Sequence, residues 1–380
     1  MMEIPLFKIY WDNDDIDAMN KVIRKGNNWA NGPEIQILEK KLAKYVNRRF
    51  AVTFNSGTSA LHAVLSSYGI KNGDEIIVPS FSFISTANAV LFVGATPQFA
   101  EIEPRTFGLD VEDVKERINE KTKAIIPMHY GGCPCSNIKA LREVAEDKDL
   151  ILIEDAAESL GSKINNEMTG SFGNSAMFSF CQNKIITTGE GGIIVTDDDE
   201  IYKKLLLFRS HGRVDKTDYF SSTFGGEYFS LGYNFRIPTV LAALGITQLN
   251  KIKKIIQLRR NIAESYSREL STNKFMKLPY CPPNYFHIYQ MYTLEILDGK
   301  DIRDQLIKKL SDSNIASKIY FNPIHLTYFY KKIFGYKTGD YPITENISNS
   351  ILSIPIYPAL SNAEIEYITN TINEFFGEKK

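Results

Sequence analysis

Ser179-Phe-Cys-Gln-Asn-Lys184-Ile-Ile-Thr-Thr-Gly189-Glu-Gly-Gly192 is the stretch on which the fold and the chemistry of this chain depend. Its single lysine stands between two apolar runs, 176–180 and 193–196, whose β-forming residues predict short strands. The glycines that follow predict a tight turn, so Lys184 is expected on a loop at a strand end, where reactive groups are commonly presented. A partly desolvated lysine amine can attack a carbonyl. These residues alone favour the plainer alternative, a surface lysine beside a hairpin. Motifs elsewhere in the chain are needed to distinguish the two interpretations.

The overall composition predicts a large, soluble, cytoplasmic protein. The chain has 380 residues, of which 43% are hydrophobic, enough for two or three domains with substantial cores. Its 44 basic and 45 acidic residues leave a net charge of -1, and no long run of one sign argues for nucleic acid or a membrane surface as a partner. The N-terminus lacks a signal-peptide pattern, and apolar stretches such as 87–95 fall far short of the roughly 20 residues of a membrane span.

Four cysteines are too few, in a chain of this size, to predict a disulfide framework. Cys133-Pro-Cys135 has the spacing of a possible metal or redox pair, but no second pair accompanies it. We interpret it as an incidental feature of a loop and predict no metal site.

Strands and helices alternate through the first half of the chain. Apolar runs predict strands at 50–54, 75–79, 96–100, 123–128 and 150–156, and helical periodicity predicts helices between them at 60–68, 86–92, 111–118 and 138–146. This alternation predicts an α/β fold with a mostly parallel sheet covered on both faces. After a long helical region at 238–270 the pattern changes to a smaller α+β arrangement, with strands at 289–296 and 317–321 and helices at 302–310 and 363–376. We therefore expect a large domain over residues 1–250 and a small domain over 251–380.

An anion site is expected where the first strand meets its helix. The strand 50–54 runs directly into Asn55-Ser-Gly57-Thr58-Ser59, and a helix follows. Free backbone N–H groups and the positive end of the helix dipole converge at such a junction, and hydroxyl groups add further donors. Serine and threonine are also the ordinary N-caps of any helix, which is the alternative interpretation.

Three further side chains are expected near the same edge of the sheet. Phe83 follows a predicted strand end and could stack on a flat ligand, although core packing is the commoner role of phenylalanine. Asp155 ends a strand that is apolar on both faces, and ligands bind at the carboxyl ends of such strands. A helix cap is the alternative for this aspartate. Glu158 follows three residues later, near the same position.

Together these features match the needs of pyridoxal 5'-phosphate. Its aldehyde needs a lysine, its ring nitrogen needs a carboxylate, its phosphate needs backbone donors and its ring needs a flat neighbour. Each feature is weak evidence by itself, and the combination is much less expected by chance.

The chain also resembles the DegT-like sugar aminotransferases, which are enzymes that use pyridoxal phosphate and have the aspartate-aminotransferase fold. The resemblance spans nearly the whole chain and rests on the lysine stretch together with Trp29-Ala-Asn-Gly-Pro33, residues 55–62 and 73–80, Glu154-Asp-Ala-Ala-Glu158, Gly170-Ser-Phe-Gly173, Gly232-Tyr-Asn-Phe-Arg236, Pro323-Ile-His325 and Leu352-Ser-Ile-Pro355. It implies a three-layer α/β/α large domain and a smaller C-terminal α+β domain.

The resemblance implies a role for each matching residue. Lys184 would bind the cofactor's aldehyde and shuttle the proton, and Asp155 would bind the ring nitrogen. The other cofactor contacts would come from Phe83 on the ring, from Glu158 near the phenolic oxygen, and from Gly57, Thr58 and Ser179 at the phosphate. Asn234 would reach that phosphate from a second subunit, so a homodimer with shared sites is expected. The residues near the sugar would be Trp29, Lys318, Tyr320 and His325.

Two departures from the family pattern concern the substrate. Relatives often have a Thr-Arg pair where this chain has Ser317-Lys318, and an aromatic-His pair where it has Tyr289-Gln290. Both fall in segments that the resemblance places near the nucleotide-linked sugar. They leave the chemistry intact and put the identity of the substrate in doubt.

The reaction that the resemblance implies is transfer of an amino group from an amino acid, with glutamate favoured, to a keto carbon of a nucleotide-linked deoxysugar. The C4 position is favoured and C3 stays open. The alternatives are a dehydratase of the same family, which commonly has histidine at the lysine position, and a regulatory relative without catalysis, which would have no need of Lys184 and Asp155.

Overall fold

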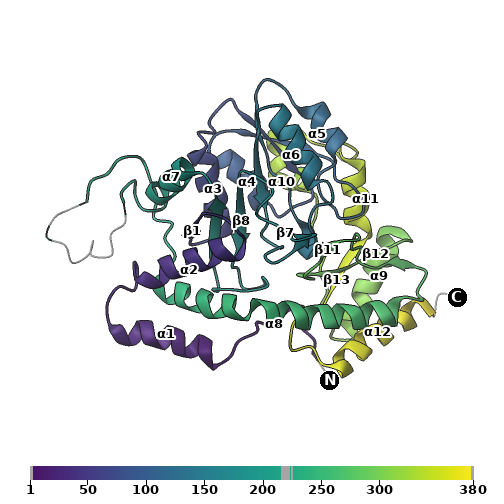
Figure 1. Ribbon diagram of the computed structural model, residues 1–380. Coiled ribbons are helices and arrows are strands. Elements are labelled where there is room, and N and C mark those ends of the chain that lie inside the picture. Colours follow the sequence, from purple (N-terminus) through teal and green to yellow (C-terminus); the bar gives the residue numbers. More distant parts are fainter. Residues whose placement is uncertain (1–2, 215–222, 224–225, 378–380) are drawn as a thin grey trace.

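The computed structural model describes residues 3–214, 223 and 226–377 and centres on a seven-stranded sheet (Figure 1). The strand order is β1-β9-β8-β5-β4-β2-β3. Strand β9 runs antiparallel to β1 and β8, while the pairs β5–β8, β4–β5, β2–β4 and β2–β3 are parallel. The strands are β1 (Phe50–Phe54), β2 (Glu75–Pro79), β3 (Thr96–Ala100), β4 (Thr122–Ile125), β5 (Ile151–Asp155), β8 (Ser175–Ser179) and β9 (Gly192–Thr196). The predicted α/β fold with a mostly parallel sheet is confirmed.

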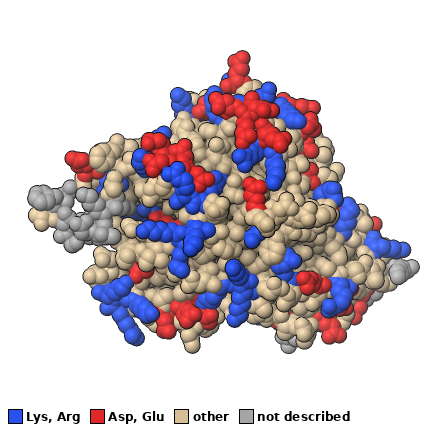
Figure 2. Space-filling view, in the orientation of Figure 1, with Lys and Arg blue, Asp and Glu red and all other residues tan. Residues whose placement is uncertain are grey.

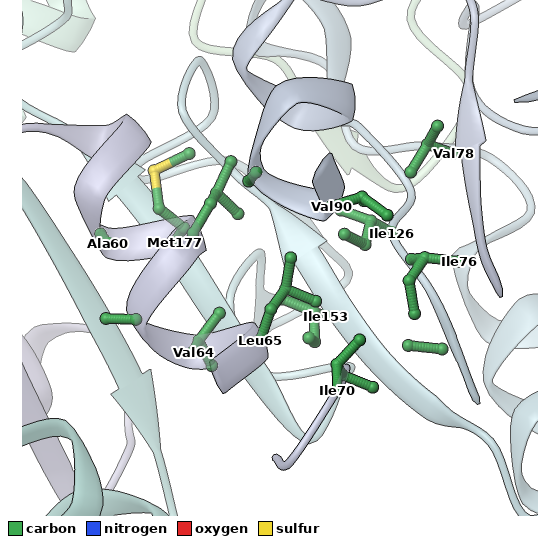
Figure 3. Packing of buried hydrophobic residues seen from close by; sticks show 14 of the residues in the cluster. Ala60, Val64, Leu65, Ile70, Ile76, Val78, Val90, Ile126, Ile153 and Met177 are labelled. Atoms are coloured by element: carbon green, nitrogen blue, oxygen red, sulfur yellow. The ribbon is translucent and has the colours of Figure 1, made fainter. Parts of the chain in front are cut away.

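Helices cover both faces of this sheet. On one face the apolar side chains of α3 (Gly57–Ser67) and α4 (Ser85–Phe92) pack against alternate strand residues such as Ile153 (Figure 3). Helix α7 (Asp199–Arg209) belongs to the same cluster. The opposite face is covered by α2 (Pro33–Tyr45), α5 (Val111–Arg117), α6 (Ile138–Asp147) and the first half of α8 (Thr239–Leu270). Within β5, Leu152 and Ile153 belong to different hydrophobic clusters, which explains why this strand is apolar on both sides.

A second, antiparallel sheet organises the C-terminal part of the chain. It contains β10 (Met276–Lys277), β12 (Tyr292–Ile296) and β13 (Ile351–Ile354), and it packs with α9 (Gly299–Asp312) and α12 (Asn362–Gly377). Ile4, near the N-terminus, belongs to this same hydrophobic cluster. Helix α8 is continuous through residue 250 and contributes side chains to both regions. The division into domains at residue 250 stays a prediction.

The remaining elements lie outside these two sheets. They are α1 (Asn13–Lys25), the short strands β6 (Lys163–Ile164), β7 (Glu167–Met168) and β11 (Tyr285–Phe286), the 3-10 turns Tyr130–Gly132 and Ile324–Leu326, α10 (Tyr328–Phe334) and α11 (Pro342–Ser350). Strands β11, β6 and β7 form a small third sheet. The strand expected at 317–321 is wrong, because Lys318 makes just an isolated bridge to Ser353. The strand expected from residue 289 begins at Tyr292, since Tyr289 has a φ of 52° that ends regular pairing.

The surface carries both signs of charge. Figure 2 shows lysine and arginine side chains interspersed with aspartate and glutamate over the face that contains α8, in keeping with the net charge of -1. Among the helices of the described residues, none combines the length and the apolar character that crossing a membrane would need.

Candidate active site

A cavity of about 410 Å³ opens at the carboxyl ends of β5 and β8. Most of the predicted site residues line it together, and they come from separate parts of the chain: Gly57, Thr58, Phe83, Asp155, Glu158, Ser179, Lys184, Lys318 and Tyr320. Parallel strands that end at one edge of a sheet bring such distant residues to one place.

Asp155 is the last residue of β5 and is almost fully buried, with 3% of its surface exposed. Its Oδ2 accepts a hydrogen bond from Thr86 Oγ1 at 2.7 Å, and its Oδ1 accepts one from the Ala157 N–H at 3.2 Å. Burial raises the pKa of this carboxyl group above its ordinary value, against the hydrogen bond from Thr86. A buried carboxylate that lines a cavity fits a cationic group such as a protonated ring nitrogen, which would compensate the cost of its burial.

Lys184 lies on the loop between β8 and β9, as predicted, and its ammonium group faces a carboxylate. Its Nζ is 3.1 Å from Glu158 Oε1, and the other carboxylate oxygen of Glu158 accepts the Gly131 N–H at 3.0 Å. Glu158 is 3% exposed, so it is fixed by these contacts rather than by solvent. The lysine amine is thereby held beside the cavity that Asp155 also lines.

The amino-terminal turn of α3 forms one end of the cavity. Ser56 caps the helix by accepting the Ser59 N–H at 3.1 Å, and the first intrahelical bond joins the Ala60 N–H to the Ser56 carbonyl. The N–H groups of Gly57 and Thr58 precede that bond, as the donors of an anion site do. The Thr58 hydroxyl lies 2.7 Å from Ser85 Oγ, another lining residue.

Gly192 brings the lysine stretch against this turn. A Cβ atom at Gly192 would lie 2.4 Å from the Ser56 carbonyl oxygen and 2.6 Å from the Gly57 nitrogen. Glycine is therefore required here for a close approach of two backbones, whereas Gly189 has the positive φ, 83°, of the predicted tight turn. The hydroxyl residues Ser85 and Thr86 were missed from the sequence, although the run of serines after β2 was the available signal.

Phe83 does not lie in the core. Its side chain is 58% exposed, lines the cavity and has Phe321 as a neighbour, with ring centroids 6.2 Å apart. A large aromatic ring left open beside a cavity is suited to stacking on a planar ligand.

Three predicted site residues lie outside the lining of this cavity. Trp29 is 51% exposed and donates its indole N–H to the Val22 carbonyl. His325 is fully buried, with Nδ1 2.6 Å from Ser80 Oγ and Nε2 3.1 Å from Glu345, which leaves no ring nitrogen for a sugar. Asn234 is exposed and pairs in an isolated bridge with Ser210.

The two departures from the family pattern occupy different surroundings. Lys318 lines the cavity, and its ammonium group lies 4.8 Å from the centre of the Tyr320 ring. Gln290 is 5% exposed, and its Nε2 donates to the carbonyl of Asn183, the residue before Lys184, at 2.6 Å. Gln290 therefore supports the lysine loop from the second sheet region.

Cys133 and Cys135 are buried free thiols, and within residues 3–214, 223 and 226–377 no cluster of three metal-ligating side chains occurs.

Known proteins with similar sequences and folds cover this chain from end to end. GDP-perosamine synthase of Escherichia coli O157:H7 is 33% identical over 379 residues, which is 100% of both chains. The structure of PseC from Helicobacter pylori, an aminotransferase involved in the biosynthesis of pseudoaminic acid, superimposes with a TM-score of 0.93 at 27% identity, over 99% of this chain and 100% of that one. The PMP form of a putative sugar aminotransferase, Spr1654 from Streptococcus pneumoniae, superimposes with a TM-score of 0.92 at 25% identity, over 99% and 98% of the two chains.

The model of one family matches nearly the full length, residues 10–373. The motifs that carry the resemblance, including the lysine stretch and Glu154-Asp-Ala-Ala-Glu158, all lie inside this range. Residues of these two motifs line the active-site cavity. The chain is thus an enzyme that belongs to the DegT/DnrJ/EryC1/StrS aminotransferase family.

Proposed function

We propose that this enzyme is a pyridoxal-phosphate-dependent aminotransferase whose acceptor is a nucleotide-linked keto sugar. The observation that carries the proposal is the convergence of Lys184, Asp155, Phe83 and the amino-terminal turn of α3 on one cavity. The similarity to GDP-perosamine synthase and PseC supports a sugar as the acceptor.

The side chains divide the work of binding the cofactor. When bound, pyridoxal phosphate supplies an aldehyde that takes up the amino group and a ring that withdraws electrons from the reacting carbon. Asp155 would hold the ring nitrogen in its cationic form, Phe83 would lie on the ring, and the N–H groups of Gly57 and Thr58 together with Ser179 would hold the phosphate.

Lys184 and Glu158 would handle the proton. The amine of Lys184 would hold the aldehyde, and it is the group placed to act as the base that moves a proton. Glu158 lies within 3.1 Å of that amine and is fixed by the Gly131 N–H, so it would orient the lysine and bind near the phenolic oxygen of the ring. The side chains of Tyr320 and Phe321, which line the cavity, would limit access of water.

The finer assignment concerns the donor, the acceptor carbon and the assembly. We propose glutamate as the donor and C4 of a nucleotide-linked deoxysugar as the acceptor position, because the Glu154-Asp-Ala-Ala-Glu158 motif looks most like that of perosamine synthase, a relative of this chain. Lys318 and Tyr320 would contact the sugar side of the cavity. We also propose a homodimer with shared sites, since Asn234 is exposed and outside its own cavity.

The cofactor assignment is tested on the purified protein. A visible absorbance band is expected, and borohydride reduction should abolish it and leave a cofactor-sized mass on Lys184. A label on another lysine would contradict the assignment. Lys184→Ala should still bind the cofactor but lose turnover, because no base remains for the proton shift.

The reaction is tested with nucleotide-linked 3-keto and 4-keto deoxysugars, each incubated with glutamate. The expected product has exchanged the ketone for an amine, and the 4-keto compounds should be the better substrates. Loss of a hydroxyl without gain of nitrogen would instead identify a dehydratase, and absence of any turnover with an unreactive Lys184 would favour a regulatory relative.

A further inference from the structure

A second cavity, of about 320 Å³, lies behind the wall of the active site. One side of it is the loop 104–107 after β3, and the other comprises residues 277–280 and part of β12. Tyr130 and Gly131 line it, and the Gly131 N–H donates to Glu158, which lines the active-site cavity. The two cavities therefore share this wall, and none of the residues assigned above to cofactor or sugar lines the second one.

His287 presents a buried hydrogen-bond donor to this second cavity. The residue is 4% exposed, and its ring stacks on Tyr289 with centroids 4.0 Å apart. Its Nδ1 accepts the Tyr289 N–H at 2.9 Å, and burial lowers the pKa of the imidazole to about 3, so the neutral ring carries its proton on Nε2. In the part of the chain that the structure describes, that N–H has no acceptor, although His287 lines the cavity.

The charged side chains around the second cavity leave an excess of positive charge. Arg105 and Lys277 are cationic, and Glu295 is the acid among the lining residues. Lys277 lies 3.0 Å from Glu295, while the guanidinium of Arg105 lies 4.2 Å from the centre of the Tyr280 ring and pairs with no carboxylate among the described residues. The exposed Arg105 therefore supplies a cation without a carboxylate partner at the cavity, beside the neutral N–H donor of His287.

The remaining lining is apolar and aromatic. Phe107, Leu278 and Met291 contribute to it, and Phe107 has a φ of 60°, a backbone conformation that phenylalanine adopts at a cost. A cavity of about 300 Å³ or more with apolar walls and a few polar groups is typical of small-molecule sites.

We propose that this second cavity binds a small organic monoanion, namely a carboxylate on an aromatic or aliphatic body. The carboxylate would accept the His287 Nε2–H and lie near Arg105 and Lys277. The body of the ligand would pack against Phe107 and Met291. The same ligand group would accept the His287 N–H, which no protein group in the described residues accepts, and would lie beside the exposed cations Arg105 and Lys277.

The chain contains native reporters for both cavities. Met291 lines the second cavity, whereas Met128 and Met177 line the active site. Purified protein with its bound cofactor, labelled with ¹³C at the methionine methyl groups, is titrated with benzoate as the probe and with benzamide as its uncharged counterpart. We expect a saturable shift of the Met291 signal with benzoate, little change at Met128 and Met177, and at least tenfold weaker binding of benzamide.

Variants separate this site from general surface attraction. Lys277→Met and His287→Phe are each expected to weaken benzoate binding by about tenfold, as loss of a charged or charge-assisted contact does. Lys274→Met is the matched control, because Lys274 is another exposed lysine three residues away that does not line the cavity. Shifts confined to Met128 and Met177, equal binding of benzamide, or equal effects of Lys277→Met and Lys274→Met would each overturn the proposal.

Discussion

Burial of the Asp155 carboxyl group costs folding free energy in the absence of a ligand. The carboxyl group is buried at the end of β5 and is satisfied by a hydroxyl and one backbone N–H, and no cationic side chain of the described residues bonds to it. Burial raises its pKa, so in the cofactor-free protein the ionised form opposes folding. A cationic ring nitrogen in the cavity would reverse that effect.

Asp155→Asn should therefore stabilise the cofactor-free protein while removing activity. Because the folded-state pKa is raised, the stability that the carboxyl group contributes is present below its unfolded pKa of about 3.9 and is lost as the pH rises through the folded value. The gain from asparagine should thus be absent near pH 4 and appear toward neutrality, as a Tm on the order of 2 °C higher by thermal denaturation.

The same variant should lower kcat by about a hundredfold, because the neutral amide no longer holds the ring nitrogen as a cation. Steady-state kinetics on the preferred keto sugar gives the comparison. The Thr86→Ser variant is the control, since it keeps the hydroxyl that donates to Asp155 Oδ2. An unchanged kcat in Asp155→Asn would mean that another acid binds the ring.

The sequence pointed to the ionisable residues Lys184 and Asp155 as site candidates, but it did not reveal the hydrogen bond that Asp155 accepts from Thr86. Lys184 after β8 and Asp155 at the end of β5 follow from strand ends and residue type. The run of serines after β2 pointed to hydroxyl groups in this region, but the bond from Thr86 to Asp155 could not be predicted, because a hydroxyl in a helix is common and the two residues are 69 positions apart. His325, which the resemblance placed near the sugar, has Ser80 and Glu345 at its two ring nitrogens, and nothing in the sequence indicated these partners.

At the scale of elements, β9 and the first turn of α3 form one unit although 135 residues separate Gly57 from Gly192. Strand β9 pairs with both β1 and β8, and Gly192 lies opposite Phe54 and Ser179, at the ends of those strands. The position of the predicted phosphate donors therefore depends on a glycine that belongs to the lysine stretch.

Gly192→Ala should weaken cofactor binding by at least about tenfold, because the added methyl group meets the Ser56 carbonyl and the Gly57 nitrogen and displaces the turn. Titration of the cofactor-free protein with pyridoxal phosphate measures the change in Kd. Gly189→Asn is the matched control: that position has open space around it, and asparagine tolerates its positive φ. Equal affinities in the two variants would show that the close approach does not position the donors.

Hydrophobic periodicity predicted the helices and central strands well. It failed for the segment 317–321, whose backbone conformation depends on tertiary contacts. The helices expected at 302–310 and 363–376 occur as α9 and α12, each slightly longer. The segment 317–321 is rich in β-forming residues, but it contributes one bridge to β13 and then turns toward the cavity, where Tyr320 and Phe321 lie. The site, rather than local propensity, determines that backbone.

On the surface of the whole molecule, residues 228–234 expose large apolar side chains that bear on assembly. Tyr228, Phe229 and Leu231 expose 60%, 62% and 81% of their surface, and Asn234 follows them. Large apolar side chains gathered in this way are typical of surfaces that contact another protein. A second copy of the chain is the partner that the proposed shared site requires, with its Asn234 at the phosphate end of this cavity.

Mixing two inactive variants tests that arrangement. In a dimer of Lys184→Ala with Asn234→Ala, one site has the intact lysine of one subunit and the intact asparagine of the other, while the second site lacks both. Random exchange of equal amounts makes half of the dimers mixed, so about a quarter of the wild-type activity should return. Mixing Lys184→Ala with Asp155→Asn is the control, because both residues line the cavity of the same chain and no intact site can form. No recovery in the first mixture, after exchange is verified by mass spectrometry, would show that each site is built from a single chain. Recovery in the control would show instead that Lys184 and Asp155 of one site come from different subunits, which contradicts the arrangement proposed here.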